Sequence, residues 1–216
     1  MEKVIQILLI PLLLPLCLVG CMTEGRVPSH GVAGQERGDQ PLWREGDYWK
    51  YRLFDGRRWS EKVVGVERDA YIVAYGNEKA AIDRRTLQFK MWLDASGRKI
   101  PSLSGGGPLF FDFPLYVGKK WGKMVEGKLF DGAPFDYLFS FRVLALEEIT
   151  VKAGTFRAFK IEQVQSDLQM GATATTYLWF SSEVKNVIKS QFVGSWGDWN
   201  IKGQDFELVE FKLAEN

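Results

Sequence analysis

From Leu42 to the end of the chain, apolar and polar residues alternate in short runs, which is the pattern of β-strands with one buried face. The clearest run extends from Phe135 to Leu146. The face that we expect to be buried carries Phe135, Tyr137, Phe139, Phe141, Val143 and Ala145. The opposite face carries Asp136, Ser140 and Arg142, so this run predicts a strand with one wet face.

Residues 148–166 predict a hairpin, because Gly154 lies between two alternating runs and can adopt the positive φ of a tight turn. Shorter runs predict further strands at Tyr48 to Phe54, Trp59 to Val66, Ala70 to Tyr75, Leu87 to Leu93, Met124 to Phe130, Thr173 to Phe180, Val187 to Val193 and Phe206 to Leu213. Residues 76–85 are the best helical candidate of the domain, and they have too few large apolar groups for more than one short turn.

These runs predict an all-β domain, an antiparallel meander of about ten strands. A long antiparallel sheet must bury one face, so we expect it to curl into a barrel or half-barrel. The composition agrees, since aromatic residues make up 14% of the chain and favour the half-buried surface of a sheet.

The first residues have a different pattern. Residues 4–19 form an apolar run after Lys3, which is typical of a secretion signal and its short helix. As a membrane span the run is too short, since a bilayer needs about 20 residues. Pro11 and Pro15 would also break its hydrogen bonding.

This run ends in Leu18-Val19-Gly20-Cys21, which resembles the lipobox of bacterial lipoproteins. The resemblance implies cleavage between Gly20 and Cys21, a diacylglycerol on the Cys21 thiol and an N-acyl chain such as palmitate on the new amino group. Cys17 follows the bulky Leu16 where a small residue is needed, so it does not fit the box. No other cofactor is expected.

The chain therefore divides into a signal peptide (residues 1–20), a lipidated flexible tether (residues 21–41) rich in Gly and charged residues, and the β domain (residues 42–216). Lipoproteins with Asp after the cysteine are retained at the inner membrane by family rule. The residue here is Met22, so the resemblance implies lipid anchoring at the outer membrane of the cell envelope.

Several turn and strand segments of the domain resemble exported bacterial proteins with uncharacterised TapB-like domains. They are Gly46-Asp47-Tyr48-Trp49, residues 113–121, residues 151–161 and residues 179–184. The similarity extends more distantly to the half-barrel of the lipoprotein-localisation factors LolA and LolB. It implies a fold and no catalytic residue.

Composition narrows the function. A formal net charge of +1 gives no basic excess for nucleic acid. His30 is the only histidine and lies in the tether, and neither Cys17 nor Cys21 remains a free thiol, so no metal site and no Cys-His or Ser-His-Asp chemistry is expected. The Ser102–Pro108 segment lacks the ending of a phosphate loop.

Carboxylates leave one route to catalysis. Glu147 with Glu148, or Asp131 with Asp136, could act as an acid/base pair on a glycan. Adjacent strand residues point to opposite faces, and residues 131–136 also fit a simple turn, so we expect a non-enzymatic protein.

Binding is the remaining expectation, and two surfaces are candidates. Phe135, Tyr137, Phe139, Phe141 and Phe159 line either an apolar ligand face in a curved sheet or a closed core. Trp196 and Trp199 lie in a turn-rich segment, either as a partner loop or folded back onto the sheet. The sequence thus predicts a lipid-anchored, periplasm-facing protein that binds a lipid or other apolar ligand, or else an interaction subunit of an envelope complex.

Overall fold

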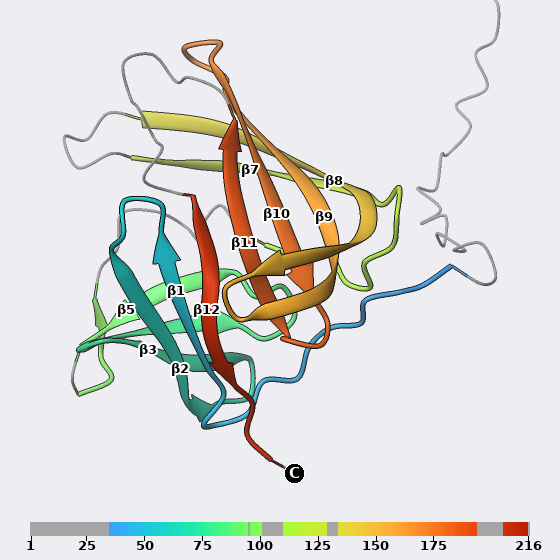
Figure 1. The fold of residues 1–216 in the computed structure, drawn as a ribbon. Helices are drawn as coiled ribbons and strands as arrows, with labels where there is room; N and C mark the ends of the chain where they lie inside the picture. The colour runs from blue at the N-terminus through green and yellow to red at the C-terminus, as the bar shows by residue number, and fades with distance from the viewer. Residues whose placement is uncertain (1–34, 95, 101–109, 129–133, 194–204, 216) are drawn as a thin grey trace, which may run out of the picture. The chain divides into compact units, whose positions relative to one another are not determined.

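The chain folds into one antiparallel sheet of twelve strands in the computed structural model, which describes residues 35–94, 96–100, 110–128, 134–193 and 205–215 (Figure 1). The strands are β1 (Tyr48–Leu53), β2 (Arg58–Val66), β3 (Ala70–Tyr75), β4 (Glu78–Asp83), β5 (Phe89–Leu93), β6 (Lys99–Ile100), β7 (Lys120–Lys128), β8 (Pro134–Val151), β9 (Gly154–Asp167), β10 (Thr173–Ser181), β11 (Asn186–Val193) and β12 (Phe206–Lys212). Within the described ranges, no helix has the length and apolar character that a membrane span requires.

Two meanders build this sheet. β1 to β6 follow one another through hairpins, and so do β7 to β12, while the pairing of β1 with β12 joins the two runs. The sheet order is β6-β5-β4-β3-β2-β1-β12-β11-β10-β9-β8-β7, which leaves β6 and β7 as its edges. The predicted all-β antiparallel fold is therefore confirmed, as a curled and open sheet made of two joined meanders.

The inner face of the sheet carries the core. Cross-strand partners lie on the same face, and Tyr51 of β1 lies opposite Trp59 of β2 and Leu208 of β12. The largest fully buried side chains are Trp49, Tyr51, Tyr71, Phe111, Phe180, Leu115, Ile161, Ile188, Leu208, Val63, Val73 and Val143. Large aromatic rings fill the curve of the sheet because many small side chains could not span it.

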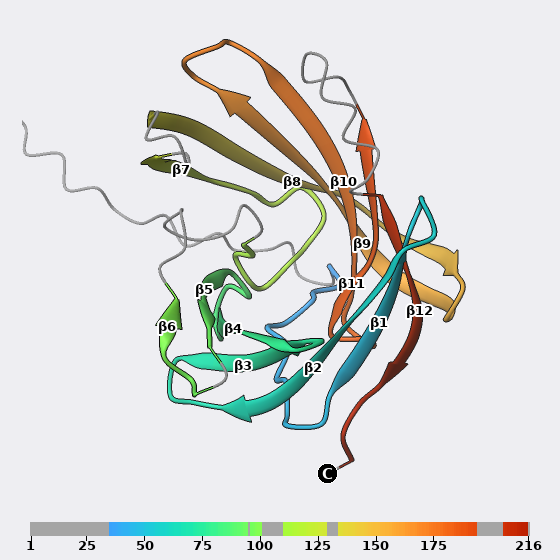
Figure 2. The same ribbon diagram turned by 90° about the vertical axis from the view of Figure 1, so that its left-hand side faces the viewer.

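Two segments without regular secondary structure run through the space inside the curve (Figure 2). One is residues 35–47, before β1, and the other is residues 110–119, before β7. They meet in an antiparallel bridge between Gly38 and Leu115, whose amides donate to each other's carbonyl oxygens at 2.9 and 2.7 Å. We call them the two covering segments, because they close part of the inner face.

The β8–β9 hairpin is longer than its neighbours, and it bends over the strands beside it. A bulge between Val143 and Ala145 shifts the register of β8, so Ala145 lies opposite Lys160 and leaves the face of Val143. β12 pairs with β11 at only two positions, and beyond them the Leu208 carbonyl accepts from the Ala153 amide of the hairpin tip at 3.2 Å. The tip thus closes the gap where β12 separates from β11.

Most predicted strands are confirmed, and the exceptions have physical reasons. Residues 76–85, where we expected no more than one short helical turn, contain β4, which pairs with β3 and β5 through the small residues Ala80 and Ala81. The predicted continuous face of β8 is wrong at Ala145 because of the bulge. Gly154 has a φ of 142°, as its hairpin prediction required. The predicted signal helix lies outside the described residues.

The described part of the predicted tether, residues 35–41, packs against the domain. Gly38 is buried and lies so close to Phe159 that a Cβ atom on it would be 2.5 Å from a ring carbon. Glu36 and Arg157 form an ion pair of 2.8 Å, and the Gln35 amide donates to the Val117 carbonyl at 2.7 Å. A residue without a side chain is required at Gly38 because the chain passes directly over the ring.

Candidate functional site

Several predicted site residues lie outside the described residues. These are the lipidation and cleavage residues Gly20 and Cys21, the tether histidine His30, and the two tryptophans of the predicted partner loop, Trp196 and Trp199. Their predicted roles stay predictions. The search for a site therefore turns to the inner face of the sheet.

The predicted apolar ligand face on β8 and β9 is part of the core. Phe139, Phe141 and Phe159 are only 3%, 2% and 3% exposed. The ring of Phe141 stacks on Trp121 at 5.0 Å and meets the edge of Phe110 at 4.9 Å. The side chain of Phe135 is outside the described residues.

The covering segments account for this burial. Phe110 lies over Phe141, and Gly38 lies over Phe159. Tyr137 is half-buried and its ring lies 6.3 Å from that of Phe139. The expectation of an uncovered ligand face at these residues is thus corrected, because coil segments, and not helices, cover the sheet there.

The covering segment of residues 110–119 is held in place by Lys119, which is 9% exposed. Its ammonium group donates to the carbonyl oxygens of Asp112 and Pro114 and pairs with the Asp112 carboxylate at 2.9 Å. Phe111 packs against Phe180 at 5.1 Å between ring centroids. One buried lysine therefore satisfies the carbonyls of a loop that has no ladder partner of its own.

The structure describes one of the two predicted carboxylate pairs in full, Glu147 with Glu148. Glu147 accepts a hydrogen bond of 2.8 Å from the Trp179 indole, whereas its neighbour Glu148 is exposed. Asp136 is the first residue of β8 whose side chain the structure describes, and Asp131 lies outside the described residues. Among the described residues, no group of three or more His, Cys, Asp or Glu side chains could hold a metal ion.

On the inner face of β2 to β5, Tyr71 is fully buried, but four other aromatic rings are only partly buried. We call this set the aromatic face, and it consists of Trp59, Tyr75, Phe89 and Trp92. Trp92 contacts Tyr75 at 5.6 Å and Phe89 at 5.1 Å between ring centroids. Trp59 stacks on the buried Tyr51 at 4.8 Å.

Glu61 lies on this apolar side of β2. It occupies the middle of the sequence Trp59, Glu61, Val63, whose alternation places all three residues on the inner face. One carboxylate oxygen accepts from the Trp59 indole N–H at 3.3 Å, and the other accepts from the Asn186 amide at 3.2 Å. Both donors are neutral.

The surroundings of Glu61 change its acidity. The Glu61 side chain is partly exposed, and burial of its carboxyl group among its neighbours raises its pKa from 4.5 to about 7. The two hydrogen bonds act in the opposite direction and are too weak to compensate. Burial, followed by the charge of Glu61, also raises the pKa of Tyr51 and Tyr75, so both remain neutral phenols.

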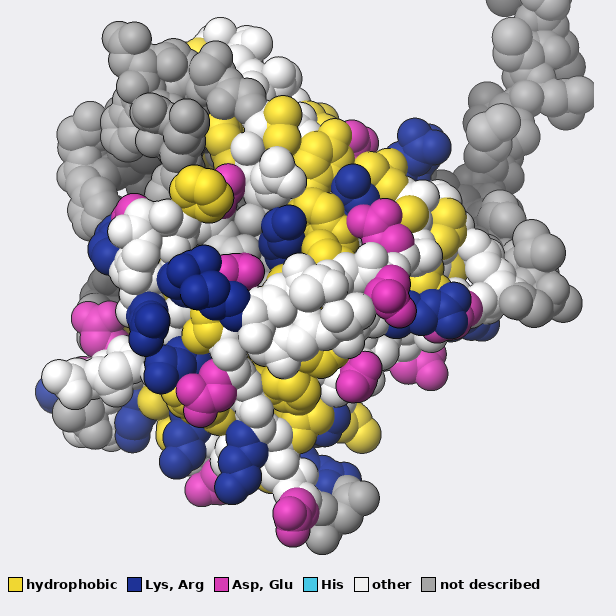
Figure 3. Space-filling view, viewed as in Figure 1, with side chains coloured by type: hydrophobic (Ala, Val, Ile, Leu, Met, Phe, Trp, Pro, Cys, Tyr) yellow, Lys and Arg dark blue, Asp and Glu magenta, His cyan; other side chains and the backbone are white. Residues whose placement is uncertain are grey.

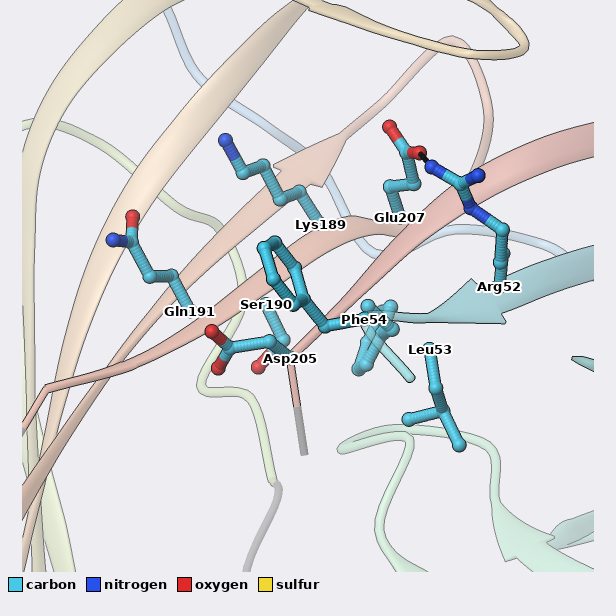
Figure 4. Close-up of a pocket in the computed structure, with 9 residues that line it drawn as sticks. Arg52, Leu53, Phe54, Lys189, Ser190, Gln191, Asp205 and Glu207 are labelled. Carbon is cyan, nitrogen blue, oxygen red and sulfur yellow. Dashed lines mark hydrogen bonds and ion pairs between the residues drawn. The ribbon is translucent and has the colours of Figure 1, made fainter. Parts of the chain in front are cut away.

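A second feature is a surface pocket of about 250 Å³ between the ends of β1, β11 and β12. Figure 4 shows Arg52 and Glu207 pointing toward each other in this pocket, where they form an ion pair of 2.6 Å. Phe54, also at the pocket, is 86% exposed. Its lining is mixed in charge and includes Lys189 and Asp205.

The face of the molecule that carries β11, β12 and the hairpin tip is also mixed in charge. Figure 3 shows Lys and Arg side chains close to Asp and Glu side chains, with hydrophobic side chains between them. The ion pairs Arg52–Glu207 and Lys50–Glu210 contribute to this pattern. Neighbouring charges of opposite sign cancel at a distance, so this face has no field that would attract a polyanion.

Comparison with known proteins finds limited similarity. No family model and no curated protein matches the chain. Among solved structures it is similar to the hypothetical lipoprotein YmcC from Escherichia coli, with 13% identity, a TM-score of 0.43, and 76% of this chain and 83% of that chain covered. A protein from Parabacteroides distasonis assigned as a lipoprotein gives 16% identity, a TM-score of 0.45, and coverage of 82% and 100%.

A third structure is that of a protein from Bacteroides fragilis assigned as exported, with a YmcC-like fold. It gives 12% identity, a TM-score of 0.38, and coverage of 81% of this chain and 99% of that chain. All three TM-scores are below 0.5. The fold described above therefore rests on the strand pairing of the chain itself.

Glu61 is the functional candidate that the sequence analysis missed. The signal was present, because a charged residue between Trp59 and Val63 breaks the apolar face of an alternating strand. Its neighbour Tyr75 lies on the next strand, whereas Asn186 is 125 residues away, and only the fold brings it to Glu61. A buried carboxylate among aromatic rings is the strongest candidate site in the described residues.

Proposed function

We propose that the protein is a lipid-anchored, non-enzymatic binding protein of the cell envelope, and that its apolar ligand binds to the aromatic face. The observation that carries the ligand site is the partial exposure of Trp59, Tyr75, Phe89 and Trp92 on the inner side of the sheet. Partly exposed rings on a concave β surface offer stacking and apolar contact to a ligand.

The position of this site follows from the covering segments. They occupy the inner face of β8 and β9, where Phe141 and Phe159 are buried by Phe110 and Gly38. On β2 to β5, the four rings of the aromatic face keep part of their surface accessible. A ligand that buries the remaining apolar area gains about 25 cal/mol per Å².

Photo-labelling tests the ligand site directly. The full chain in lipid nanodiscs is irradiated with an uncharged alkyl diazirine, and labelled residues are located by peptide mass spectrometry. We expect label on the strands of the aromatic face, reduced by Trp92→Ala and unchanged by Phe54→Ala, whose ring is exposed elsewhere. Equal labelling of this face in the wild type and in Trp92→Ala would contradict the proposal.

Lipid attachment at Cys21 is the second part of the proposal, supported by the lipobox-like sequence that ends the apolar run. Two or more acyl chains, at about 0.8 kcal/mol per buried methylene, anchor a protein stably. We expect that Cys21→Ala abolishes metabolic labelling by a fatty acid, whereas the matched control Cys17→Ala keeps it. Labelling of the Cys21→Ala protein would refute the assignment.

Location at the outer membrane is the finer part of this proposal, supported by Met22 at the position after the cysteine. Fractionation of inner and outer membranes tests it. We expect the wild type in the outer-membrane fraction and Met22→Asp in the inner-membrane fraction. Wild-type protein in the inner-membrane fraction would refute the outer-membrane location and leave only the proposal of an envelope protein.

An interaction subunit of an envelope complex is the second candidate function, favoured by the 86% exposure of Phe54 beside the pocket of β1, β11 and β12. Exposed aromatic rings beside a pocket are common anchors in protein interfaces. Chemical cross-linking in intact cells, with the wild type and Phe54→Ala compared, tests it. Identical cross-linked species in the two proteins would exclude a role for this ring.

A further inference from the structure

We infer that the ligand of the aromatic face carries a positively charged organic ammonium group, which binds to the Glu61 carboxylate. This inference rests on the proposed function and names the chemistry of its ligand. Four observations support it: the position of Glu61, its hydrogen-bond partners, its lack of a counter-charge, and the rings beside it.

The position of Glu61 is not that of an ordinary surface carboxylate. Its strand places it on the inner face between Trp59 and Val63, and Val63 is completely buried. The matching position on the outer face, Lys62, is exposed. In its ionised form, a carboxylate on the inner side is stabilised by a compensating partner, because transfer of an ion from water to protein is costly.

The hydrogen bonds of Glu61 leave it incompletely satisfied. The Trp59 indole and the Asn186 amide each donate one hydrogen bond, at 3.3 and 3.2 Å, to separate oxygens. A carboxylate has about four acceptor positions. The two that remain can accept from an ammonium group without loss of the existing bonds.

No positive charge from the described residues compensates Glu61. The groups that face it are Tyr51 from β1, Tyr75 from β3 and Asn186 from β11, and all three are neutral. Two basic side chains of β1 and β11 have other partners, since Arg52 pairs with Glu207 and Lys189 lies over the Trp179 ring. Glu61 can avoid the cost of burial by holding a proton, and a bound ammonium group would supply the counter-charge that its ionised form does not find among these neighbours.

The rings beside Glu61 favour an organic cation. Trp59 donates to the carboxylate and stacks on Tyr51 at 4.8 Å, and Tyr75 lies close enough for Glu61 to raise its pKa. Ring faces attract ammonium groups by cation–π interaction, and a carboxylate adds direct charge pairing. The combination selects an amine that carries an apolar group for the remaining rings, Phe89 and Trp92.

Calorimetric titration with three matched probes tests this inference. The full chain in nanodiscs, with empty nanodiscs as the blank, is titrated with butylammonium, butanol and butyrate, which share one apolar chain and differ in charge. We expect butylammonium to bind at least about tenfold more tightly than butanol, because a charge-assisted hydrogen bond replaces a neutral one. We expect butyrate to bind most weakly of the three.

Glu61→Gln is the decisive variant, because it keeps the size and the hydrogen-bonding groups of the side chain but removes its charge. We expect it to abolish the preference for butylammonium and to leave butanol binding unchanged. Glu148→Gln, at an exposed site on β8, is the matched control and should keep the preference. An unchanged preference in Glu61→Gln, with the far-ultraviolet spectrum of the wild type, would overturn the inference.

The pH dependence gives an independent readout. Butylammonium stays charged below about pH 9 because amines of this kind have pKa values near 10.4. The preference should therefore increase from pH 6 to pH 8 as Glu61 ionises, and a preference that is flat over this range contradicts the role of Glu61. If butanol binds without any preference for the amine, the inference fails and the proposed function stands. If none of the probes binds, both fail.

Discussion

The inner face has two halves, one on β8 and β9 and one on β2 to β5. Both carry aromatic residues, but these residues differ in how far they are buried. On β8 and β9, Phe139, Phe141 and Phe159 are at most 3% exposed, whereas Trp59 and Trp92 on β2 and β5 are partly exposed. The difference does not come from the strands, which alternate in the same way in both halves. It goes with the two covering segments, whose rings pack on Phe141 of β8 and Tyr71 of β3 but, among the described ring contacts, not on Trp59 or Trp92.

This comparison shows that coil can complete the core of an all-β domain. The covering segments have few backbone partners, and they are held by particular contacts: the Gly38–Leu115 bridge, the Lys119 ammonium group, and the Phe111 amide, which donates to the Thr86 carbonyl at 2.7 Å. Burial of their apolar side chains offsets the entropy lost when a loop is ordered. Their placement leaves Trp59, Tyr75, Phe89 and Trp92 partly exposed.

Removal of an aromatic ring from a covering segment should produce the largest decrease in the free energy of unfolding. Phe111→Ala deletes a ring that is 2% exposed and packs on Phe180, so it should lower the free energy of unfolding by about 3–5 kcal/mol. Phe89→Ala, in the partly exposed half, should cost roughly half as much. Urea titration measures both values, and an equal cost for the two variants would contradict the comparison.

In the partly exposed half, the charge of Glu61 should make the free energy of unfolding of the protein depend on pH. Its pKa is raised to about 7 in the folded protein, so between pH 4.5 and 7 the folded state keeps a proton that the unfolded state has lost. Stability therefore falls as the pH rises through this window. Glu61→Gln lacks this loss and should be about 2–3 kcal/mol more stable than the wild type near pH 8.

Denaturation of both proteins across this pH range measures the effect of Glu61. Below about pH 4.5 the carboxyl group is neutral in both states, so the pH-dependent advantage of Glu61→Gln should disappear. A difference between the two proteins that stays constant from pH 4 to pH 8 would show that the Glu61 carboxyl group is not buried as described.

The close approach of the first covering segment to β9 gives a smaller effect. In Gly38→Ala, the added methyl group would lie 2.5 Å from a carbon of Phe159, so the chain or the ring must move. We expect a loss of about 1–3 kcal/mol, typical of an overpacked core. Asp39→Ala, at an exposed neighbour, should change stability by less than about 0.5 kcal/mol. Thermal denaturation separates the two variants.

The smallest effect is expected outside both halves. Arg52 and Glu207 form a 2.6 Å ion pair with side chains that are 36% and 27% exposed. Arg52→Ala should cost less than about 1 kcal/mol, and added salt should reduce this cost. Photo-labelling of the aromatic face should not change. A larger cost would show that the pocket of β1, β11 and β12 contributes to the core.

Much of the fold could be predicted because strands leave a local signal. The predicted runs at Ala70 to Tyr75 and Thr173 to Phe180 agree with observed β3 and β10 almost to the residue. β4 was missed because its inward positions are Ala80 and Ile82, and a small residue gives little contrast with its polar neighbours. The β8 bulge was missed because one extra residue is not visible in the alternation until its partner strand is known.

The sequence predicted the type of the candidate site, an aromatic face on the sheet, but not the residues that form it. An aromatic ligand face was expected, and the expected residues, Phe139, Phe141 and Phe159, turned out to be covered. The sequence of the cover, with Phe110, Phe111, Phe113 and Leu115, is apolar, but nothing in it says which strands it will contact. Contact between a loop and a sheet depends on the whole chain path, so local patterns do not encode it.

The sequence by itself determined the all-β class, most strand positions and the inward direction of Trp59, Glu61 and Val63, because these depend on the two-residue period of a strand. The tertiary structure alone decided that β1 pairs with β12, that coil covers β8 and β9, and that Tyr51, Tyr75 and Asn186 surround the Glu61 carboxylate. Those features join segments more than a hundred residues apart in some cases, as with Asn186 and Glu61. They exist only when the curled sheet brings distant segments to the same side.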